Sequence, residues 1–281
     1  MDVTLLGTGS PIPTLDRAGT SIAVEFDDET VLVDCGPGTT HRCVEHEIHP
    51  ADVETLFLTH NHLDHTADLF HFVVASWSLG REALTVYGPA NTERLLDALY
   101  DCYDEDIAYR REFYDEAGID DVEWVQTTDV LVVEGDGWQA TMRQVDHAIE
   151  TYAHRFETDD ATFVFSADTT PEAGIADFAA NADLLVQDAC VARETVDPNP
   201  DHDGLVWDRL TEPMSDEAAA GLSETHCTPR EAGEIAAEAG VDTLVLTHLL
   251  PYRDTDAMAE QAKSAFDGQV VVAEDGLRFS L

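Results

Sequence analysis

The chain has 281 residues with an ordinary apolar fraction of 44%, enough to bury a large core in one domain or two. It carries 58 acidic and 14 basic residues, a formal charge of −44, and Lys263 is its single lysine. Regular apolar runs exclude a disordered acidic protein, and carboxylates spread along the whole chain exclude an acidic tail. The charge indicates a halophilic host with molar salt inside its cells, because there the Debye length is only about 3 Å and self-repulsion is screened.

Membrane and export signals are not found in the sequence. No run of about 18 apolar residues occurs, so no membrane-spanning helix is expected. The opening MDVTLLGTGS has no basic start and no long apolar run, which predicts a strand and a turn in place of a signal peptide. The five cysteines are scattered without a CxxC pair. We therefore expect a reduced, cytoplasmic protein that does not bind membranes.

Predicted strands and helices alternate along the chain, with no linker or low-complexity stretch between them. The predicted strands, in chain order, are 2–6, 21–25, 30–33, 55–58, 83–87, 129–134, 138–145, 151–157, 161–166, 183–186, 242–246, 269–272 and 276–280. The predicted helices are 66–79, 91–101, 172–180, 228–239 and 256–266. This order favours an α/β fold in which helices lie outside a mixed sheet, with four layers in a single domain over residues 1–281.

A near-repeat links two distant strands. Residues 52–60 read DVETLFLTH and residues 240–248 read GVDTLVLTH, so each has an acidic turn, an apolar strand and a terminal histidine. Ligands of such sheets gather at the carboxyl ends of strands. Two similar half-domains that face each other would bring His60 and His248 to one edge. Chance similarity of two apolar strands is the alternative, and the shared Thr-His ending favours the first interpretation.

The run HNHLDH, residues 60–65, packs three histidines and an aspartate into six positions. Neutral imidazole is the usual zinc ligand, and a carboxylate is its common companion. His60 and His62 can point at one ion from an extended loop, whereas Asp64 and His65 follow at the start of a helix. A helix-capping loop would explain the aspartate but not three histidines. We therefore interpret the run as a metal-binding motif.

This motif resembles the signature of the metallo-β-lactamase superfamily, a group of αββα proteins that are mostly dinuclear metal hydrolases. Other segments resemble the remaining motifs of that family in the same order. They are LVDCGPGT with Asp34, VDHAIE with His147, FVFSADTTP with Asp168 and LVLTHLLP with His248. The resemblance therefore covers nearly the whole chain.

The resemblance implies a site for two zinc ions, and manganese or iron are alternatives because sets of histidine and carboxylate ligands accept several metals. The implied ligands are His60, His62 and His147 for the first ion and Asp64, His65 and His248 for the second. Asp168 and a hydroxide would bridge the ions, and Asp34 would support the ligands from behind. Two cations lower the pKa of bound water toward about 7, which supplies a nucleophile at neutral pH.

The segments LLGTGSPIPTLDRAGTS and ETHCTPREAGEIAAEAGVDTLVLTHLLP resemble ribonuclease Z and its arylsulfatase-like and phosphodiesterase relatives. In that branch a histidine, matched here by His226, stabilises the transition state and protonates the leaving group. A carboxylate orients that histidine. Asp188 of VQDAC stands where glutamate is usual, and its side chain is one methylene shorter. The catalytic candidates are Asp64, His226 and Asp188.

Ribonuclease Z carries a long arm that grips tRNA between the third-motif histidine and the bridging aspartate. Here His147 and Asp168 are only 21 positions apart, which leaves room for one hairpin. No basic patch replaces the arm, although lysine and arginine normally supply affinity for nucleic acid. We therefore expect a small-molecule or nucleotide phosphodiester as substrate and consider precursor tRNA a weak candidate. Arg155 is a candidate for holding a phosphate or sulfate, with a surface ion pair as the alternative.

Two segments are candidates for shaping the pocket. Residues 100–118 are rich in tyrosine and are a candidate lid over the metals. The alternatives are a helix core and a homodimer face. Residues 191–214, with Trp207, are long for a connection and suit a lid. The sequence as a whole predicts a dinuclear zinc hydrolase, a ribonuclease Z-like phosphodiesterase that uses a metal-bridging hydroxide. The alternatives are an arylsulfatase-like or other ester or lactone hydrolase on the same site, and a metal-binding protein without turnover.

Overall fold

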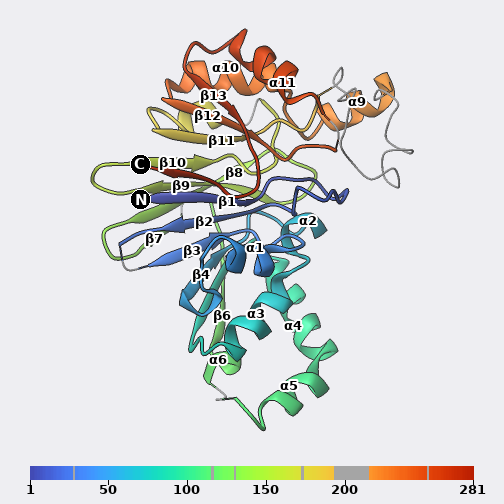
Figure 1. Ribbon diagram of the computed structural model, residues 1–281, viewed down its shortest axis with the longest axis vertical. Helices are drawn as coiled ribbons and strands as arrows, with labels where there is room; N and C mark the ends of the chain where they lie inside the picture. The colour runs from blue at the N-terminus through green and yellow to red at the C-terminus, as the bar shows by residue number, and fades with distance from the viewer. Residues whose placement is uncertain (28, 115–116, 130, 172–173, 193–214, 252) are drawn as a thin grey trace.

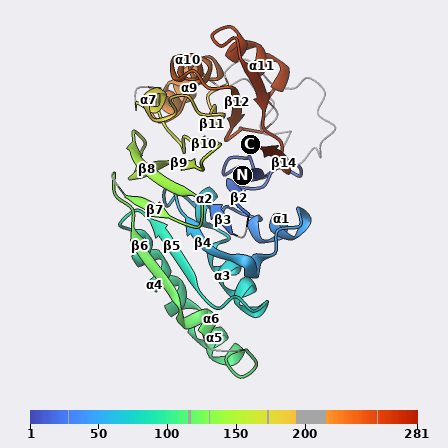
Figure 2. The same ribbon diagram turned by 90° about the vertical axis from the view of Figure 1, so that its left-hand side faces the viewer.

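The computed structural model describes residues 1–281 except 28, 115–116, 130, 172–173, 193–214 and 252. Within that part, two seven-stranded sheets lie face to face with helices on their outer faces (Figures 1 and 2). The first sheet contains, in spatial order, β14 (Leu277–Ser280), β1 (Asp2–Gly7), β2 (Ser21–Glu25), β3 (Thr30–Val33), β4 (Val53–Phe57), β5 (Leu84–Gly88) and β6 (Val122–Gln126). The second contains β13 (Gln269–Val272), β12 (Thr243–Thr247), β11 (Leu184–Asp188), β10 (Thr162–Phe165), β9 (Thr151–Glu157), β8 (Gln139–Val145) and β7 (Val132–Glu134). The αββα prediction is confirmed.

Helices cover the outer face of each sheet. Those over the first sheet are α1 (Thr39–Glu45), α3 (Leu69–Ser78) and α4 (Thr92–Cys102), and those over the second are α7 (Ile175–Phe178), α10 (Pro229–Ala239) and α11 (Thr255–Lys263). The remaining described helices are η1 (Pro50–Asp52), α2 (Leu63–Thr66), α5 (Asp104–Arg110), α6 (Ala117–Asp120) and α9 (Asp216–Ser223).

Helix α10 shows how the sequence sets these boundaries. Thr228 and Glu231 form a capping box, and Pro229 occupies the first turn, where its missing N–H costs nothing. Gly240 ends the helix with φ of 68°, a left-handed conformation that glycine adopts without a steric penalty. The predicted helix at 228–239 is therefore confirmed to within one residue.

Three apolar layers hold the four structural layers together. One lies between the two sheets and is rich in aromatic side chains, including Phe57, Phe156, Phe163 and Phe165. The other two lie between each sheet and its helices. Side chains alternate across a strand, so one strand serves the central layer and an outer layer at once. The sheets therefore form a rigid base whose edge can carry a site.

The structure corrects several predicted boundaries. β6 was not predicted, because VEWVQ is short, half exposed and carries a glutamate at its second position. The helix predicted at 66–79 is observed mainly as α3, with its first residue in the separate α2. Between them the Asp68 N–H donates to the Cys35 carbonyl oxygen at 3.0 Å in place of a helical partner. The helix predicted at 172–180 is only the short α7, and residues 172–173 lie outside the described part.

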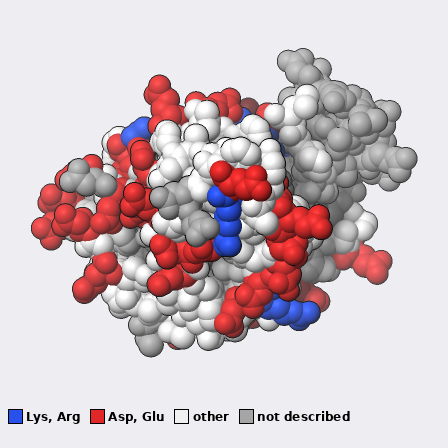
Figure 3. Space-filling view, turned by 90° about the horizontal axis from the view of Figure 1, so that it is seen from below, with Lys and Arg blue, Asp and Glu red and all other residues white. Residues whose placement is uncertain are grey.

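Acidic side chains dominate the surface. The face seen from below in Figure 3 carries many aspartates and glutamates and few lysines or arginines.

Within the described ranges, no helix is both long and apolar enough to cross a membrane.

The turn between β13 and β14 secures the loop that follows β1. Asp275 Oδ1 accepts the Thr8 N–H at 3.0 Å, and Oδ2 accepts the Ala18 N–H at 2.7 Å. The loop then runs against the HNHLDH segment, where a Cβ on Gly19 would lie 2.8 Å from the carbonyl oxygen of Asp64. The turn between β13 and β14 therefore packs the first loop onto the candidate site, and only glycine permits so close an approach.

Candidate metal centre

The candidate ligands gather at one edge of the two sheets. His60 follows β4 of the first sheet, whereas Asp168 follows β10 and His248 follows β12 of the second. His147 lies in the connection between β8 and β9. The predicted meeting of the two Thr-His strand ends is seen in the structure, since the groups that contain His60 and His248 are joined by Asp168.

The first group is His60, His62, His147 and Asp168, whose ligand atoms all lie within 4.8 Å of one another. His62 Nδ1 is 3.0 Å from His60 Nε2 and 3.2 Å from His147 Nε2. Asp168 Oδ2 is 3.8 Å from His60 Nε2 and 3.9 Å from His147 Nε2. Three imidazole nitrogens and a carboxylate oxygen thus surround one small volume, an arrangement suited to a single four-coordinate ion.

The second group is Asp64, His65 and His248, again with ligand atoms within 4.8 Å of one another. Asp64 Oδ2 is 3.1 Å from His248 Nε2 and 3.8 Å from His65 Nε2. Asp168 Oδ2 also reaches this group, at 3.3 Å from His248 Nε2 and 3.4 Å from His65 Nε2. A single carboxylate oxygen therefore lies between the two groups.

Three of the histidines are fixed through their other ring nitrogen. These contacts are His65 Nδ1 with Asp34 Oδ2 at 2.7 Å, His60 Nδ1 with Thr59 Oγ1 at 2.9 Å, and His147 Nδ1 with the Thr225 carbonyl oxygen at 3.0 Å. Such contacts set the orientation and tautomer of a metal-binding imidazole. Asp34 thus lies behind the candidate ligands, where the sequence motif suggested.

The backbone is strained at the same edge. Asp34, Ala167 and His248 have φ of 62°, 55° and 59°, in the left-handed region that residues other than glycine rarely adopt. Asp34 contacts the candidate ligand His65, Ala167 precedes the candidate ligand Asp168, and His248 is itself a candidate ligand. Strain of this kind persists where the surrounding structure holds a functional geometry in place.

The protonation behaviour of the residues suits divalent cations. Burial lowers the pKa of His60, His62 and His147, which favours the neutral imidazole that binds metals. Burial also opposes charge on His65 and His248, but the nearby carboxylates, Asp168 foremost among them, outweigh it and raise the pKa of each to about 10. The second group therefore attracts positive charge. In addition, the buried Nε2 of His65 has no hydrogen-bond partner, so no protein group occupies the position that an ion would take.

Beside the two groups lies a histidine–aspartate pair. His226 precedes α10, and its Nδ1 donates to Oδ2 of Asp188 at the end of β11, at 2.9 Å. Burial would lower the pKa of His226, but Asp188 raises it to about 9. The His226 ring centroid is 5.1 Å from those of both His147 and His248. The imidazole therefore borders both candidate metal positions.

Backbone amides compensate for the short side chain of Asp188. The Cys190 N–H donates to its Oδ1 at 3.0 Å, and the Thr169 and Cys227 N–H groups donate to its Oδ2 at 3.3 Å. The carboxylate is thus held close to His226 without the extra methylene of a glutamate.

Arg155 does not face the metal centre. Its Nη1 donates to the carbonyl oxygens of Phe178 at 3.0 Å and Ala180 at 3.3 Å, and its Nη2 pairs with Glu157 at 2.8 Å. The guanidinium secures the end of α7, so the ion-pair alternative is correct and the anion-binding hypothesis is wrong.

The segment at 100–118 belongs mainly to the helical layer. Tyr103 stacks on Phe70 of α3 and Tyr100 meets the same ring edge-on, with ring centroids 5.0 and 5.3 Å from that of Phe70. Tyr109 is 62% and Phe113 66% exposed, near α5 at the end of the molecule away from α2 (Figures 1 and 2). No described contact makes the segment a lid over the metals.

The second proposed lid, 191–214 with Trp207, lies outside the described residues apart from Val191 and Ala192, which are buried. Two further features were not anticipated from the sequence. Cys190 has its sulfur within 4.8 Å of ligand atoms of His226 and His248. Arg253 follows the last motif and has buried, unpartnered nitrogens. No pattern in the sequence marks either residue.

Comparisons with known proteins find similar sequences and similar folds. The family model described as Beta-lactamase superfamily domain matches residues 29–249. A protein of Mycobacterium marinum named ribonuclease Z is 32% identical over 285 residues, 98% of this chain and 96% of the relative. The metallo-beta-lactamase fold protein YhfI of Bacillus subtilis superposes with a TM-score of 0.73 at 24% identity, covering 99% of this chain and 98% of that one. The short form of human tRNase Z gives a TM-score of 0.69 at 19% identity, covering 100% of this chain and 99% of that one.

Proposed function

The chain belongs to the beta-lactamase superfamily and is a metal-dependent hydrolase, and from this premise we propose that it is a ribonuclease Z-like phosphodiesterase with two zinc ions. The observation that carries the proposal is the position of the His226–Asp188 pair against two ligand groups joined at Asp168. A metal-storage or structural site has no need of a buried proton donor at its edge. The alternative of a protein without turnover is therefore disfavoured.

The first ion would be held by His60, His62 and His147 and the second by Asp64, His65 and His248, with Asp168 shared. Histidine-rich sets favour zinc, while manganese and iron remain alternatives. When bound, the two cations would lower the pKa of water toward about 7 and stabilise negative charge on the phosphoryl oxygens.

Side chains of the protein would supply the proton transfer and would orient the histidines. His226 would hold a proton at Nε2 and transfer it to the leaving oxygen, because its Nδ1 is committed to Asp188. Asp188 would keep the imidazole in that tautomer and orientation, which makes it a positioning residue. Asp34 and Thr59 would do the same for His65 and His60.

Phosphodiesters are the favoured substrates because the named relatives are ribonucleases. Turnover of a panel with phosphodiester, sulfate ester and lactone members tests this choice. We expect phosphodiester hydrolysis with the largest kcat/KM. A larger kcat/KM for an aryl sulfate or a lactone would favour the arylsulfatase-like or lactonase alternative instead.

Small phosphodiesters are expected to be cleaved more readily than precursor tRNA. Residues 147–168 form only β9, β10 and short connections, so no tRNA-gripping arm is present between His147 and Asp168. The mycobacterial relative aligns over 96% of its own length, so it has no long extra segment either, and RNA cleavage remains the competing outcome. The test compares a bis(aryl) phosphate with precursor tRNA at several salt concentrations. Efficient, site-specific removal of a 3′ trailer would contradict the prediction.

We further propose a halophilic, cytoplasmic protein that folds as one domain over residues 1–281. All five cysteines are free, which suits a reducing compartment. A homodimer through the exposed rings near α5 stays a prediction.

Stability is expected to depend strongly on salt. In tens of millimolar salt the Debye length grows to between about 10 and 30 Å, so neighbouring carboxylates repel one another. With a formal charge of −44, we expect Tm to fall by about 10 °C or more and activity to be lost. Both should recover when potassium chloride is added. An equal Tm in dilute and molar salt would contradict the halophilic interpretation.

A further inference from the structure

Asp275, in the turn between β13 and β14, has a carboxylate whose two oxygens each meet two donors. Oδ1 accepts the N–H of Thr8 at 3.0 Å and its hydroxyl at 2.8 Å. Oδ2 accepts the Ala18 N–H at 2.7 Å and pairs with Arg42 Nη2 at 3.0 Å. The Asp275 side chain is only 4% exposed, so a donor that lost this acceptor would find little water in its place. The carboxylate therefore fastens the loop of residues 8–20, between β1 and β2, near both of its ends.

The first end of this loop supports the backbone of His248. The Thr8 carbonyl oxygen accepts the Leu249 N–H at 3.0 Å, and Gly9 forms a parallel bridge with Leu249. His248 directly precedes Leu249 and has the strained φ of 59°. The residue that Asp275 holds on one side thus holds, on its other side, the backbone beside a candidate ligand.

The second end of the loop packs against Asp64. A Cβ on Gly19 would lie 2.8 Å from the Asp64 carbonyl oxygen, and a Cβ on Gly36 would meet the same oxygen. The Gly19 N–H donates to the Pro37 carbonyl oxygen at 3.0 Å, and the Gly36 N–H donates to that of Thr20 at 3.1 Å. The loop therefore touches both a ligand that follows the first sheet and the neighbour of one that follows the second.

The first ligand group is held in a different way. Within the described residues, no hydrogen bond joins the loop of residues 8–20 to His60, His62 or His147. His147 is fixed instead by the Thr225 carbonyl oxygen at 3.0 Å. The network around Asp275 thus distinguishes the second metal position from the first.

We propose that Asp275 is a positioning residue for the second metal ion, and that it acts through the loop of residues 8–20 to hold Asp64 and His248 at the spacing one ion needs. This inference rests on the proposed function, in which those two residues bind the same ion. Contacts that orient metal ligands from behind contribute about 10- to 100-fold to metal affinity. Asp275 would therefore set the affinity for the second ion without contacting it.

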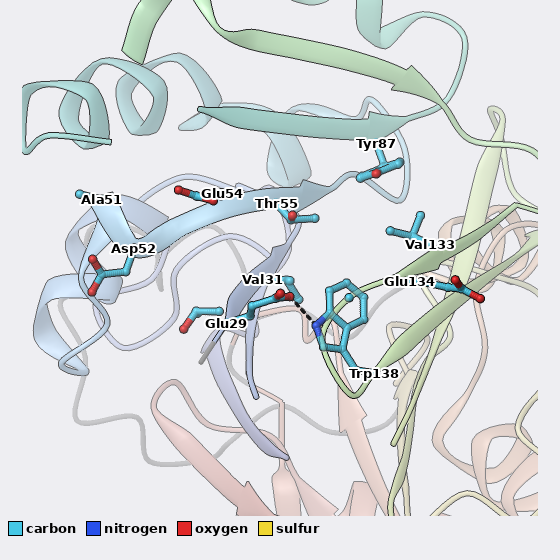
Figure 4. A pocket seen from close by; sticks show the side chains of 12 residues that line it. Glu29, Val31, Ala51, Asp52, Glu54, Thr55, Tyr87, Val133, Glu134 and Trp138 are labelled. Atoms are coloured by element: carbon cyan, nitrogen blue, oxygen red, sulfur yellow. Dashed lines mark hydrogen bonds between the residues drawn. The ribbon is translucent and has the colours of Figure 1, made fainter. Parts of the chain in front are cut away.

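The opposite end of the sandwich offers a matched control. A hollow of about 500 Å³ lies there between the first sheet and the hairpin of β7 and β8, with Glu29 and Trp138 at its border (Figure 4). Trp138 Nε1 donates to Glu29 Oε2 at 2.6 Å, so this carboxylate also joins two distant segments. Glu29 precedes β3, whereas the ligand support Asp34 follows the other end of that strand. Removal of the Glu29 carboxylate should therefore affect stability and not the metals.

The test measures zinc binding to the full-length, metal-stripped protein in molar salt, in competition with a chromophoric chelator. In Asp275→Asn we expect the dissociation constant of the second zinc to rise about 10- to 100-fold and that of the first to change by less than about threefold. Thr8→Val replaces only the hydroxyl that donates to Asp275 and should give a smaller rise in the same constant. Phosphodiester turnover by Asp275→Asn should be low at two equivalents of zinc and recover when zinc is in excess. In Glu29→Gln both constants should keep their wild-type values.

Three results would overturn the inference. They are an unchanged second constant in folded Asp275→Asn, an equal weakening of both zinc ions, and an equal rise of the second constant in Glu29→Gln. If Asp275→Asn does not fold, an unchanged second constant in Thr8→Val overturns the inference.

Failure of the proposed function has a separate signature, which is seen in the wild-type protein. Two bound zinc ions without phosphodiester turnover would refute the phosphodiesterase and leave the test of Asp275 in force. A single bound zinc ion would refute the dinuclear site and this inference with it.

Discussion

Replacing Asp168 with alanine is expected to release metal and to abolish measurable turnover. Its Oδ2 lies 3.3 to 3.9 Å from nitrogens of four histidines in the two ligand groups. Without it, those groups lose their shared negative charge. Even residues behind a metal ligand cost about 10- to 100-fold in affinity when removed, so a shared ligand should cost more. Elemental analysis after dialysis measures the metal, and bis(aryl) phosphate hydrolysis measures the turnover.

Asp177→Ala is the matched control for this prediction. Asp177 is an exposed aspartate on α7, and its removal should leave both the metal content and the turnover of the wild-type protein. Two ions per chain retained by Asp168→Ala would show that this carboxylate does not join the groups.

Replacing His226 with alanine is expected to reduce kcat about 10²- to 10⁴-fold while metal content stays at the wild-type level. The imidazole borders the ligand groups but points its Nδ1 at Asp188, so it is placed to act on the leaving group. The loss should depend on the substrate. An alkyl leaving group needs a proton and should suffer most, whereas a nitrophenolate leaves without one and should suffer least.

His71→Ala provides the control, because His71 is half exposed on α3 and its contacts, with Asp68 at 2.9 Å and with the His41 ring at 5.7 Å between centroids, involve no candidate ligand. Asp188→Asn should give a smaller loss than His226→Ala with the same dependence on leaving group. Equal losses of kcat for all leaving groups, or metal depletion as severe as in Asp168→Ala, would indicate that His226 is a metal ligand and not the proton donor.

The metal-binding edge was predictable because its residues follow strands in a recognisable order. HNHLDH and the two Thr-His endings place His60 and His248 at strand termini, and the near-repeat predicted that two facing half-domains bring those termini to one edge. Asp34 and Asp168 likewise follow predicted strands. Local sequence is sufficient in these cases because each residue's position is fixed by the strand immediately before it.

Other features depend on contacts between distant segments, which the sequence does not display. From the sequence, Arg155 fits an anion ligand and a structural group equally well. The packing of α7 against β9, where Arg155 donates to the Phe178 carbonyl oxygen, distinguishes these two roles. The reach of Asp188 depends on amides of Thr169, Cys190 and Cys227, two of them from other strands or loops. β6 is held by its register with β5, not by a strong strand pattern of its own. Arg253 stands out only because its surroundings lack a partner.

The most direct test of the central claim is a zinc titration of metal-stripped protein in molar salt, with phosphodiester turnover followed at each addition. The two ligand groups predict that turnover is absent without metal and reaches its maximum at two equivalents of zinc per chain. Full turnover at one equivalent, or turnover that persists after stripping, would contradict a dinuclear metal-dependent phosphodiesterase.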